Sequence, residues 1–427
     1  FSPILLERGR AVEDRQADVE KFWQTGLLDT ESNVQFGEGG AGTFSDGKLN
    51  TMVKDKFGYN RRVLETFVKF GAPAEILYLQ KPHIGTDKLA DVVKNMRLEI
   101  ERLGGEVRFG VRLDSLNIKN TGNGDSKKLE SINVTDRFLG KAEVIECDRL
   151  ILAIGHSARD TFLSLNESGV MMQPKSFAIG VRVEHSQEMI GRNQYGELYK
   201  ALPTADYKLT HQTKDGRGVY SFCMCPGGYV VNASSEKGML AVNGMSDYLR
   251  DGINANSAIV VTVGVEDFDG TDALAGMRFQ RKWEKKAFDA AGGKIPVQLF
   301  GDFKKNVPSS SAGAIAPQMK GAYSWGNVRS IFPEFIARCL EEGITEFGKK
   351  IPGYDRDDAV LSGVESRTSS PVRILRDETL QSSVKGLYPC GEGAGYAGGI
   401  TSAAMDGLKV AEAVSQKYMA FDNPKNV

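Results

Sequence analysis

Apolar side chains recur between residues 89 and 103 with the spacing of one helix face, at Leu89, Val92, Val93, Met96, Ile100 and Leu103. Gly104 and Gly105 then end the pattern, as glycine commonly does just beyond a helix. Residues 106–113 alternate between apolar and polar side chains, which is the period of a strand. The pattern predicts a helix that returns the chain to a sheet.

Other segments in this first part of the chain have the apolar content of strands. Residues 3–9 predict a buried strand that ends in the acidic Glu7, and residues 149–154 predict a second strand. Between them, residues 129–135 and 143–147 predict a hairpin-like pair. Strands and helices mixed in this way indicate the α/β class.

Short alternating strands and two amphipathic helices replace this pattern in the middle of the chain. They are predicted at 177–183, 219–223, 229–233, 279–291 and 333–347. We therefore expect an inserted α+β substrate or cap domain over residues 173–359. Residues 1–172 and 360–427 would then form the two parts of one nucleotide-binding domain.

Residues 386–407 join a short strand through a glycine-dense turn to a helix of small residues. The six glycines between Gly391 and Gly407 remove Cβ atoms that would block close contact with a ligand. The helix that begins near Gly399 directs unpaired N–H groups and the positive end of its dipole at an anion. The segment predicts a dinucleotide-binding turn, although such turns also occur in α/β proteins without a ligand.

The same segment resembles the C-terminal flavin-binding segment of flavoproteins with two dinucleotide-binding domains. The resemblance implies that Gly391 and Glu392 meet the ribityl-pyrophosphate of FAD and that the helix beginning at Gly398, Gly399 and Ile400 faces the isoalloxazine. It implies a Rossmann-like FAD-binding domain of the glutathione-reductase type.

Glu7 would bind the adenosine ribose in such a domain, although an acid after an apolar run is also an ordinary strand end. A Gly-x-Gly-x-x-Gly turn is expected roughly 20 residues before this acid. The chain begins at Phe1 and leaves no room for it. We therefore expect the first strand of the domain to be missing, and the protein to hold flavin poorly without it.

A literal Gly-x-Gly-x-x-Gly occurs at Gly37–Gly42, but its flanks do not fit a phosphate-binding turn. Residues 33–36 form a short strand at best, and residues 43–49 are rich in turn formers instead of forming an apolar helix. We interpret the segment as a loop that lines the cofactor.

Residues 36–49, with residues 5–9 before them, are similar to the bacterial NAD(FAD)-utilising dehydrogenase family, largely uncharacterised predicted FAD-dependent oxidoreductases. Further matching blocks lie at 220–228, 243–246, 254–257 and 365–373. From this end of the chain the resemblance implies cofactor contacts by Glu7, Arg8, Gly39, Gly40, Ser45, Gly47 and Lys48. It also implies that Val111 or Arg112 lies at the FAD adenine, with a plain βαβ packing unit as the alternative.

The strand end at Ala153 to His156 resembles a segment that closes over the cofactor in these enzymes. Ala153 and Gly155 are therefore cofactor candidates, because Gly155 permits close approach of the backbone. His156 is more readily interpreted as a structural hydrogen-bonding histidine than as a catalyst.

Catalytic side chains are hard to assign from the sequence. Cys223 and Cys225 would be awkward partners for a disulfide in an extended strand, so they are either structural or place a thiol near the flavin or substrate. Arg367 and Arg373 could hold a substrate carboxylate or phosphate, with salt bridges as the alternative. His83, His185 and His211 have no partners at triad or metal spacing, so we expect neither a hydrolase nor a metal site.

Composition limits the class of partner. The 427 residues, 41% hydrophobic and 26% charged, exceed what one compact domain usually holds. A net charge of -1 gives no electrostatic reason to bind nucleic acid or anionic lipid, and no apolar run is long enough for a membrane span. Five scattered cysteines form no secreted disulfide framework, which favours the cytoplasm. We expect a small-molecule partner, while the oligomeric state is left open.

These observations predict an FAD-dependent oxidoreductase that passes a hydride or electron pair between flavin and a small organic substrate. NAD(P)H is a candidate reductant, although no second nicotinamide-binding unit is evident in the sequence. The alternative is a non-catalytic flavin-binding redox sensor or structural flavoprotein. A tRNA-modifying flavoprotein is disfavoured, because the chain lacks a basic surplus.

Overall fold

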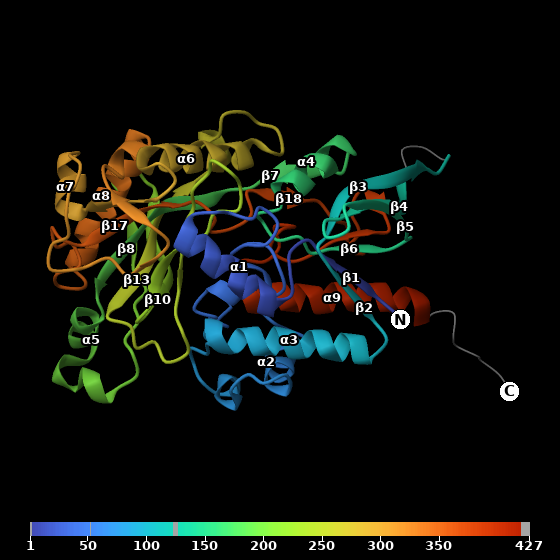
Figure 1. Ribbon diagram of the computed structural model, residues 1–427, viewed down its shortest axis with the longest axis horizontal. Helices are drawn as coiled ribbons and strands as arrows, with labels where there is room; N and C mark the ends of the chain where they lie inside the picture. Colours follow the sequence, from blue (N-terminus) through green and yellow to red (C-terminus); the bar gives the residue numbers. More distant parts are fainter. Residues whose placement is uncertain (1, 52, 123–126, 420–427) are drawn as a thin grey trace.

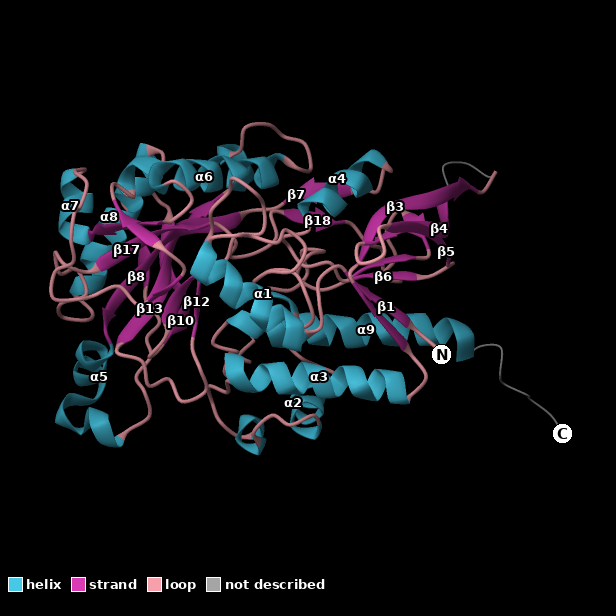
Figure 2. Ribbon diagram, in the orientation of Figure 1, coloured by secondary structure: helices cyan, strands magenta, loops and turns pink. Residues whose placement is uncertain are grey.

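The computed structural model describes residues 2–51, 53–122 and 127–419. The molecule is a mixed α/β structure with two distinguishable parts (Figure 1). A large sheet with its helices occupies the left of the view, and several small sheets with long helices occupy the right (Figure 2). The predicted domain boundaries remain a prediction.

The large sheet is built only from strands between residues 177 and 365. Across the sheet the order is β16 (Tyr323–Trp325), β14 (Ile295–Leu299), β17 (Val360–Glu365), β8 (Phe177–Ser186), β13 (Asn254–Val263), β10 (Gly218–Cys225) and β9 (Thr210–Gln212). Neighbouring strands are antiparallel except β14 and β16. Strand β8 is buried from Phe177 to His185, because it lies in the middle of the sheet and both of its faces are covered.

Two amphipathic helices cover one face of this sheet, as their apolar periodicity predicts. Helices α6 (Ala275–Ala291) and α8 (Glu334–Gly348) contribute Phe279, Trp283, Leu340 and Phe347 to one core with the strands. A three-stranded sheet of β12 (Val242–Met245), β11 (Tyr229–Asn232) and β15 (Met319–Lys320) places β12 against β8, β10, β13 and β17. The remaining helices here are α5 (Gln187–Tyr195) and α7 (Phe300–Lys305) with the short 3-10 helices η3 (Gly196–Ala201), η4 (Val265–Asp267) and η5 (Arg329–Ile331).

Two of the parallel strand pairs in the other part of the molecule form sheets of their own. Strand β1 (Ile4–Glu7) pairs with β2 (Glu106–Phe109), and β20 (Leu387–Pro389) pairs with β6 (Leu150–Leu152). In the described part of the chain these pairs are separate two-stranded sheets. The Rossmann subtype therefore remains a prediction.

Antiparallel strands and helices complete this part. Strands β3 (Val111–Asn120), β4 (Lys127–Asp136) and β5 (Lys141–Glu146) form a meander that β19 (Val384–Lys385) joins, and β7 (Met172–Pro174) pairs with β18 (Val372–Ile374). The helices are α1 (Val12–Thr25), α2 (Tyr59–Lys69), α3 (Thr86–Arg102), α4 (Arg159–Glu167) and α9 (Ile400–Met419), with the 3-10 helices η1 (Gly40–Phe44) and η2 (Ala74–Leu77). Helices α2, α3 and α9 share one core.

Local periodicity located α3, α6, α8 and the strands predicted above, whereas elements such as α1, α2 and β13 were not predicted. The structure differs from the predicted elements at three places. The predicted strand 106–113 is divided into β2 and β3 by Gly110, whose φ of 71° turns the chain. Residues 33–36 form bends instead of a short strand. The apolar strand β1 is not buried, because Ile4 and Leu5 are 46% and 43% exposed and β2 is its only partner strand among the described residues.

Among the helices described, none combines the length and the apolar character that a membrane crossing requires.

Candidate cofactor site

The glycine-rich loop 37–49 packs against the start of helix α9. A Cβ added to Gly42 would lie 3.2 Å from Ile400 Cγ1. Thr401 Oγ1 donates a hydrogen bond of 2.8 Å to the Leu49 carbonyl, although the two residues are 352 positions apart. Two of the segments predicted to line the cofactor therefore form one surface.

Glu7 ties strand β1 to the same loop. Its Oε1 accepts hydrogen bonds from the backbone N–H groups of Gly9 (2.8 Å) and Gly37 (3.0 Å). The two glycines approach so closely that a Cβ on Gly9 would lie 2.5 Å from Gly37 Cα. Both positions therefore require glycine, and Glu7 positions the loop through its backbone.

Arg15, which the sequence analysis missed, holds the approach to the loop. This fully buried guanidinium donates to the carbonyls of Asn33 (2.9 Å), Val34 (2.9 Å) and Glu38 (2.7 Å). It fixes a segment that has no secondary structure of its own. A basic residue on the otherwise apolar face of α1 is the signal that could have identified it.

The strand end at Gly155 lies against the turn that follows β20. A Cβ on Gly393 would clash with the Gly155 carbonyl, and Glu392 Oε1 lies 3.2 Å from Nδ1 of the buried His156. Nε2 of His156 makes no hydrogen bond within the described part of the chain. The structural role predicted for this histidine stays a prediction.

Helix α9 holds the turn through Asp406. Its carboxylate accepts the backbone N–H of Gly391 (2.8 Å) and pairs with Arg376 through bonds of 2.7 and 2.9 Å. Arg376 in turn covers the ring of Tyr396 at 3.8 Å. Asp406 and Arg376 therefore contact the turn at both of its ends.

Open space lies beside the backbone at four of the predicted contact residues. A Cβ added to Gly40, Gly155, Gly398 or Gly399 would meet no atom within 4 Å. Gly40 and Gly155 have φ angles of 59° and 68°, which glycine adopts readily. A ligand could therefore touch the bare backbone here, next to the N-terminus of α9.

The remaining predicted contacts from the first part of the chain are placed as follows. Arg8 pairs with Asp160 (2.6 Å) and covers the Phe36 ring at 4.5 Å. The side chain of Val111 is buried in the core around β3 and β4, and Arg112 pairs with Asp114 (2.9 Å). Three more contacts complete the set: Ser45 Oγ donates to the Gly42 carbonyl (2.7 Å), Gly39 precedes η1, and Ala153 is exposed.

Asp46 and Lys48 connect the loop to the large sheet. Buried Asp46 pairs with Lys48 Nζ (2.7 Å) and with Arg250 Nε (2.8 Å). The Lys48 ammonium also contacts the Met224 carbonyl at the end of β10, while Gly47 lies close to the Gly85 backbone. Burial lowers the pKa of Lys48, but the Asp46 carboxylate and the two neighbouring thiols outweigh burial and raise it.

Cys223 and Cys225 belong to this connection. The buried Arg182 donates to the Cys223 carbonyl (2.9 Å), lies 3.8 Å from Cys225 Sγ and pairs with Glu365 (2.9 Å). We call Asp46, Lys48, Arg182, Cys223, Cys225 and Glu365 the Cys223 cluster. A charged residue within the apolar strand 177–183 was the sequence signal for Arg182.

Arg367 lies in a second buried cluster. It pairs with Glu284 (3.0 Å), which also binds Arg159 (2.7 Å), and it donates to Ser235 (2.6 Å). We call Arg159, Gln280, Glu284, Ser366 and Arg367 the Glu284 cluster. The salt-bridge alternative therefore describes Arg367, whose guanidinium is occupied by protein partners.

Arg373 keeps a free donor beside the glycine turn. Its Nε is buried and makes no hydrogen bond to a described residue, and its guanidinium lies 5.3 Å from the Tyr396 ring. A Cβ on Gly395 would lie 3.0 Å from Arg373 Cα. Arg373 and His156 thus offer unused polar atoms at the same turn.

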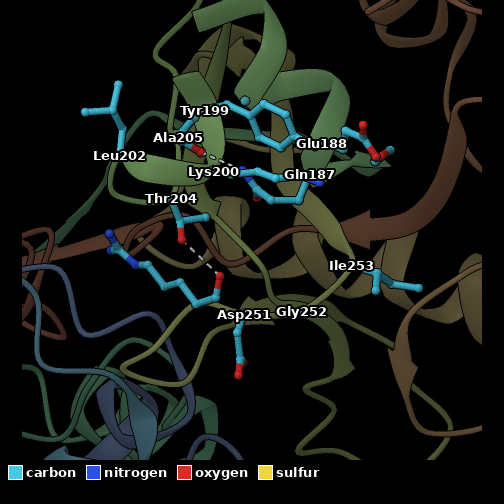
Figure 3. Close-up of a pocket in the computed structure, with 13 residues that line it drawn as sticks. Gln187, Glu188, Tyr199, Lys200, Leu202, Thr204, Ala205, Asp251, Gly252 and Ile253 are labelled. Carbon is cyan, nitrogen blue, oxygen red and sulfur yellow. Dashed lines mark hydrogen bonds between the residues drawn. The ribbon is translucent and has the colours of Figure 1, made fainter. Parts of the chain in front are cut away.

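A cavity of about 630 Å³ lies elsewhere, beside α5 and residues 250–253 (Figure 3). Gln187, Tyr199 and Lys200 line it, and the Gln187 amide donates to the Ala205 carbonyl (2.9 Å). Arg250, which also lines it, reaches Asp46. The cavity is therefore connected to the Cys223 cluster by one side chain and is distinct from the glycine loops.

Comparison with known proteins shows one close relative. The chain is 53% identical over 432 residues to a protein of Clostridium beijerinckii described as uncharacterized, and the match covers 100% of this chain and 78% of that protein. Residues 176–368 match the family described as FAD-dependent protein, C-terminal domain-like. The matched residues contain the whole seven-stranded sheet.

Similarity to solved structures is weak. Glycerol-3-phosphate dehydrogenase from Bacillus halodurans, complexed with FAD, gives a TM-score of 0.39 at 10% identity over 100% of this chain. A geranylgeranyl bacteriochlorophyll reductase-like protein from Thermoplasma acidophilum gives 0.35 at 9% identity over 80%. The chain spans 66% and 56% of the length of these two proteins.

Proposed function

The chain belongs to the same family as its Clostridium beijerinckii relative and carries the C-terminal domain of FAD-dependent proteins, and from this premise we propose that it is an FAD-dependent oxidoreductase. It would pass a hydride or electron pair between flavin and a small organic substrate, with NAD(P)H as a candidate reductant. Residues 173–359 would form the substrate domain between the two parts of the FAD-binding domain.

The observation that carries the proposal is that three glycine-bearing segments contact one another and leave backbone uncovered. Loop 37–49 contacts α9 through Gly42 and Ile400, the turn after β20 contacts Gly155 through Gly393, and a Cβ on Gly40, Gly155 or Gly399 would meet no atom within 4 Å. The N-terminus of α9 supplies N–H groups for a pyrophosphate. Arg373 Nε and His156 Nε2, which have no hydrogen-bond partner among the described residues, lie beside the same turn. These features fit an extended, phosphate-bearing cofactor such as FAD.

Each part of the site has a proposed task. Glu7 would accept a ribose hydroxyl, and the turn from Gly391 to Ile400 would hold the pyrophosphate and ribityl chain. Gly40 and Gly155 would allow the loops to close over the cofactor. When bound, FAD supplies an acceptor or donor for two electrons, so that the protein's own task is to orient it and to exclude water.

Valine at Gly399 tests the site. The added side chain would fill space that is open in the protein and that FAD would need, so the fold should be retained while FAD affinity falls. A steric cost of about 1–3 kcal/mol corresponds to a loss of roughly ten- to a hundredfold. Titration of the protein with FAD, followed by flavin fluorescence, measures it.

Gly326→Val is the matched control, because a Cβ there also meets no atom within 4 Å and the residue lies in the large sheet part. Equal FAD affinity of the Gly399→Val protein and the unaltered protein would contradict the site. Anaerobic addition of NADH and NADPH to the FAD-bound protein then tests turnover. Bleaching of the flavin bands is expected for a reductase, whereas a redox sensor without turnover would retain them.

A further inference from the structure

Strand β10 carries a bulge that contains Cys223 and directly precedes Cys225. Phe222 pairs with Ala258 and Cys225 pairs with Asn256, so two residues on β10 lie opposite one residue on β13. Cys223, the first residue of the bulge, has a φ of 42°. A residue with a Cβ adopts this left-handed conformation at a cost, and such strain is concentrated at functional positions.

Because of the bulge, Cys223 and Cys225 need not be as far apart as residues two apart in an extended strand. Residues two apart in an extended strand are too far apart for a disulfide, but the chain is not extended at Cys223. Cys225 Sγ donates a hydrogen bond of 3.3 Å to the Cys223 carbonyl, so the Cys225 side chain turns back toward Cys223. Cys223 is half-buried while Cys225 is fully buried, so Cys223 is the more accessible of the two cysteines.

Two cations face the pair from separate elements. Arg182 on β8 contacts Cys225 Sγ and the Cys223 carbonyl, and Lys48 in loop 37–49 contacts the intervening Met224 carbonyl. The hydrogen bond with Cys225 lowers the pKa of Cys223, burial opposes the shift, and Arg182 and Lys48 reinforce it. The pKa of Cys225 is raised. A thiolate at Cys223 beside a thiol at Cys225 is the arrangement of a reactive pair.

The pair is in contact with one of the proposed flavin loops. Lys48 belongs to loop 37–49, which packs on α9 through Gly42 and Ile400, and its ammonium contacts the carbonyl of Met224 between the two cysteines. The strand segment that carries the thiols is therefore joined by a direct contact to this loop.

We propose that Cys223 and Cys225 form a redox-active dithiol that exchanges an electron pair with the FAD of the proposed function, on which this inference rests. In the oxidative direction a bond forms between the two Sγ atoms and the S–H bond of Cys225 breaks. The two electrons, the Cys225 proton and one proton from solvent pass to FAD, which becomes FADH2. The reverse reaction restores the Cys223 thiolate and the Cys225 thiol.

The first experiment counts thiols. The protein is treated with diamide, a mild thiol oxidant, then denatured, alkylated and mapped by mass spectrometry. We expect a disulfide within the peptide that contains residues 218–225, and its absence from the Cys223→Ser and Cys225→Ser proteins. Cys147→Ser is the matched control, because Cys147 is also half-buried but is remote from the cluster. Failure of the disulfide to form would overturn the inference.

The second experiment tests the link to flavin. The oxidised, FAD-bound protein is titrated anaerobically with dithionite while the flavin spectrum is recorded. Because a disulfide takes up two electrons, the unaltered protein should consume about twice the reducing equivalents of Cys223→Ser or Cys225→Ser before reduction is complete. Equal consumption in a protein that binds FAD overturns the inference alone. Absence of FAD binding overturns the proposed function and the inference together, so the two failures are distinguishable.

Discussion

The Glu284 cluster and the Cys223 cluster both bury arginine, but they satisfy its charge differently. In the Glu284 cluster, Arg159 binds both oxygens of Glu284 (2.7 and 2.8 Å) and Arg367 does the same (3.1 and 3.0 Å). In the Cys223 cluster, Arg182 has one carboxylate partner, Glu365, and its other contacts include a carbonyl and a thiol. We call the first cluster closed, because guanidinium groups bind both oxygens of its carboxylate, and the second open, because its arginine also contacts a thiol.

The difference separates a structural role from a chemical one. Burial raises the pKa of Glu284, but Arg159 and Arg367 outweigh burial and lower it, so the carboxylate stays ionised and joins α4, α6 and the segment after β17. A thiol placed beside a buried guanidinium, as in the Cys223 cluster, can instead ionise and be oxidised. Buried arginine therefore does not mark a site by itself; the nature of its partner does.

The largest expected effect on stability comes from removing the negative charge of Glu284 in the closed cluster. Glu284→Gln keeps the shape of the side chain but leaves two buried guanidinium groups without their carboxylate. Breaking a buried ion pair in this way typically costs about 3–5 kcal/mol. Urea unfolding followed by circular dichroism measures the change. Glu236→Gln is the control, because Glu236 also pairs with Arg159 but is partly exposed; an equal effect of both variants would contradict the comparison.

The next prediction concerns buried groups of β8 that have no charged partner. Glu184 and His185 make no ion pair with a described residue. Burial raises the pKa of Glu184 to about 7 and lowers that of His185 to about 4. Glu184 contributes stability that is present below its unfolded pKa and is lost as pH rises toward 7. The His185 contribution is present above the unfolded pKa of histidine and is lost as pH falls toward 4. The two therefore oppose each other.

When one of the two residues is replaced, the free energy of unfolding should show the pH dependence that the other residue causes. In Glu184→Gln the free energy of unfolding should fall by about 3 kcal/mol relative to the unaltered protein as pH drops from 6.5 to 4, since one pKa unit corresponds to about 1.4 kcal/mol. His185→Gln should show the opposite dependence between pH 4.5 and 7. Urea unfolding at each pH measures the difference, and parallel curves for all three proteins would show that burial does not shift these pKa values.

The smallest expected effect is a shift in the pKa of the Cys223 thiol in the open cluster. Lys48→Met removes one positive charge near Cys223 and should raise the pKa of its thiol by about one unit, which reduces the thiolate roughly tenfold below that pKa. The rate of alkylation by iodoacetamide as a function of pH, followed at the Cys223 peptide, gives the midpoint. Lys54→Met, at an exposed position of the same region, should leave the midpoint unchanged. An unchanged midpoint in Lys48→Met would exclude Lys48 from the field at the thiol.

Particular residues show where sequence reasoning succeeded. The period of the apolar residues located α3, α6 and α8, because one buried face is a local property of a helix. The glycines of 386–407 indicated a turn between β20 and α9 for a similar reason. The same reasoning failed at β1, since exposure of Ile4 and Leu5 depends on what packs against the strand. It also failed at Cys223, where a bulge depends on the register with β13.

The amino-acid sequence by itself determined the mixed α/β class, the positions of α3, α6, α8 and some of the strands, and the glycines that leave backbone uncovered. These follow from side-chain periodicity and from the conformational freedom of glycine, both of which act within a few residues. Only the tertiary structure decided that Arg367 closes on Glu284, that Arg182 and Lys48 face Cys223, and that Gly42 meets Ile400. Such contacts join residues tens to hundreds of positions apart, and packing of the whole chain selects them.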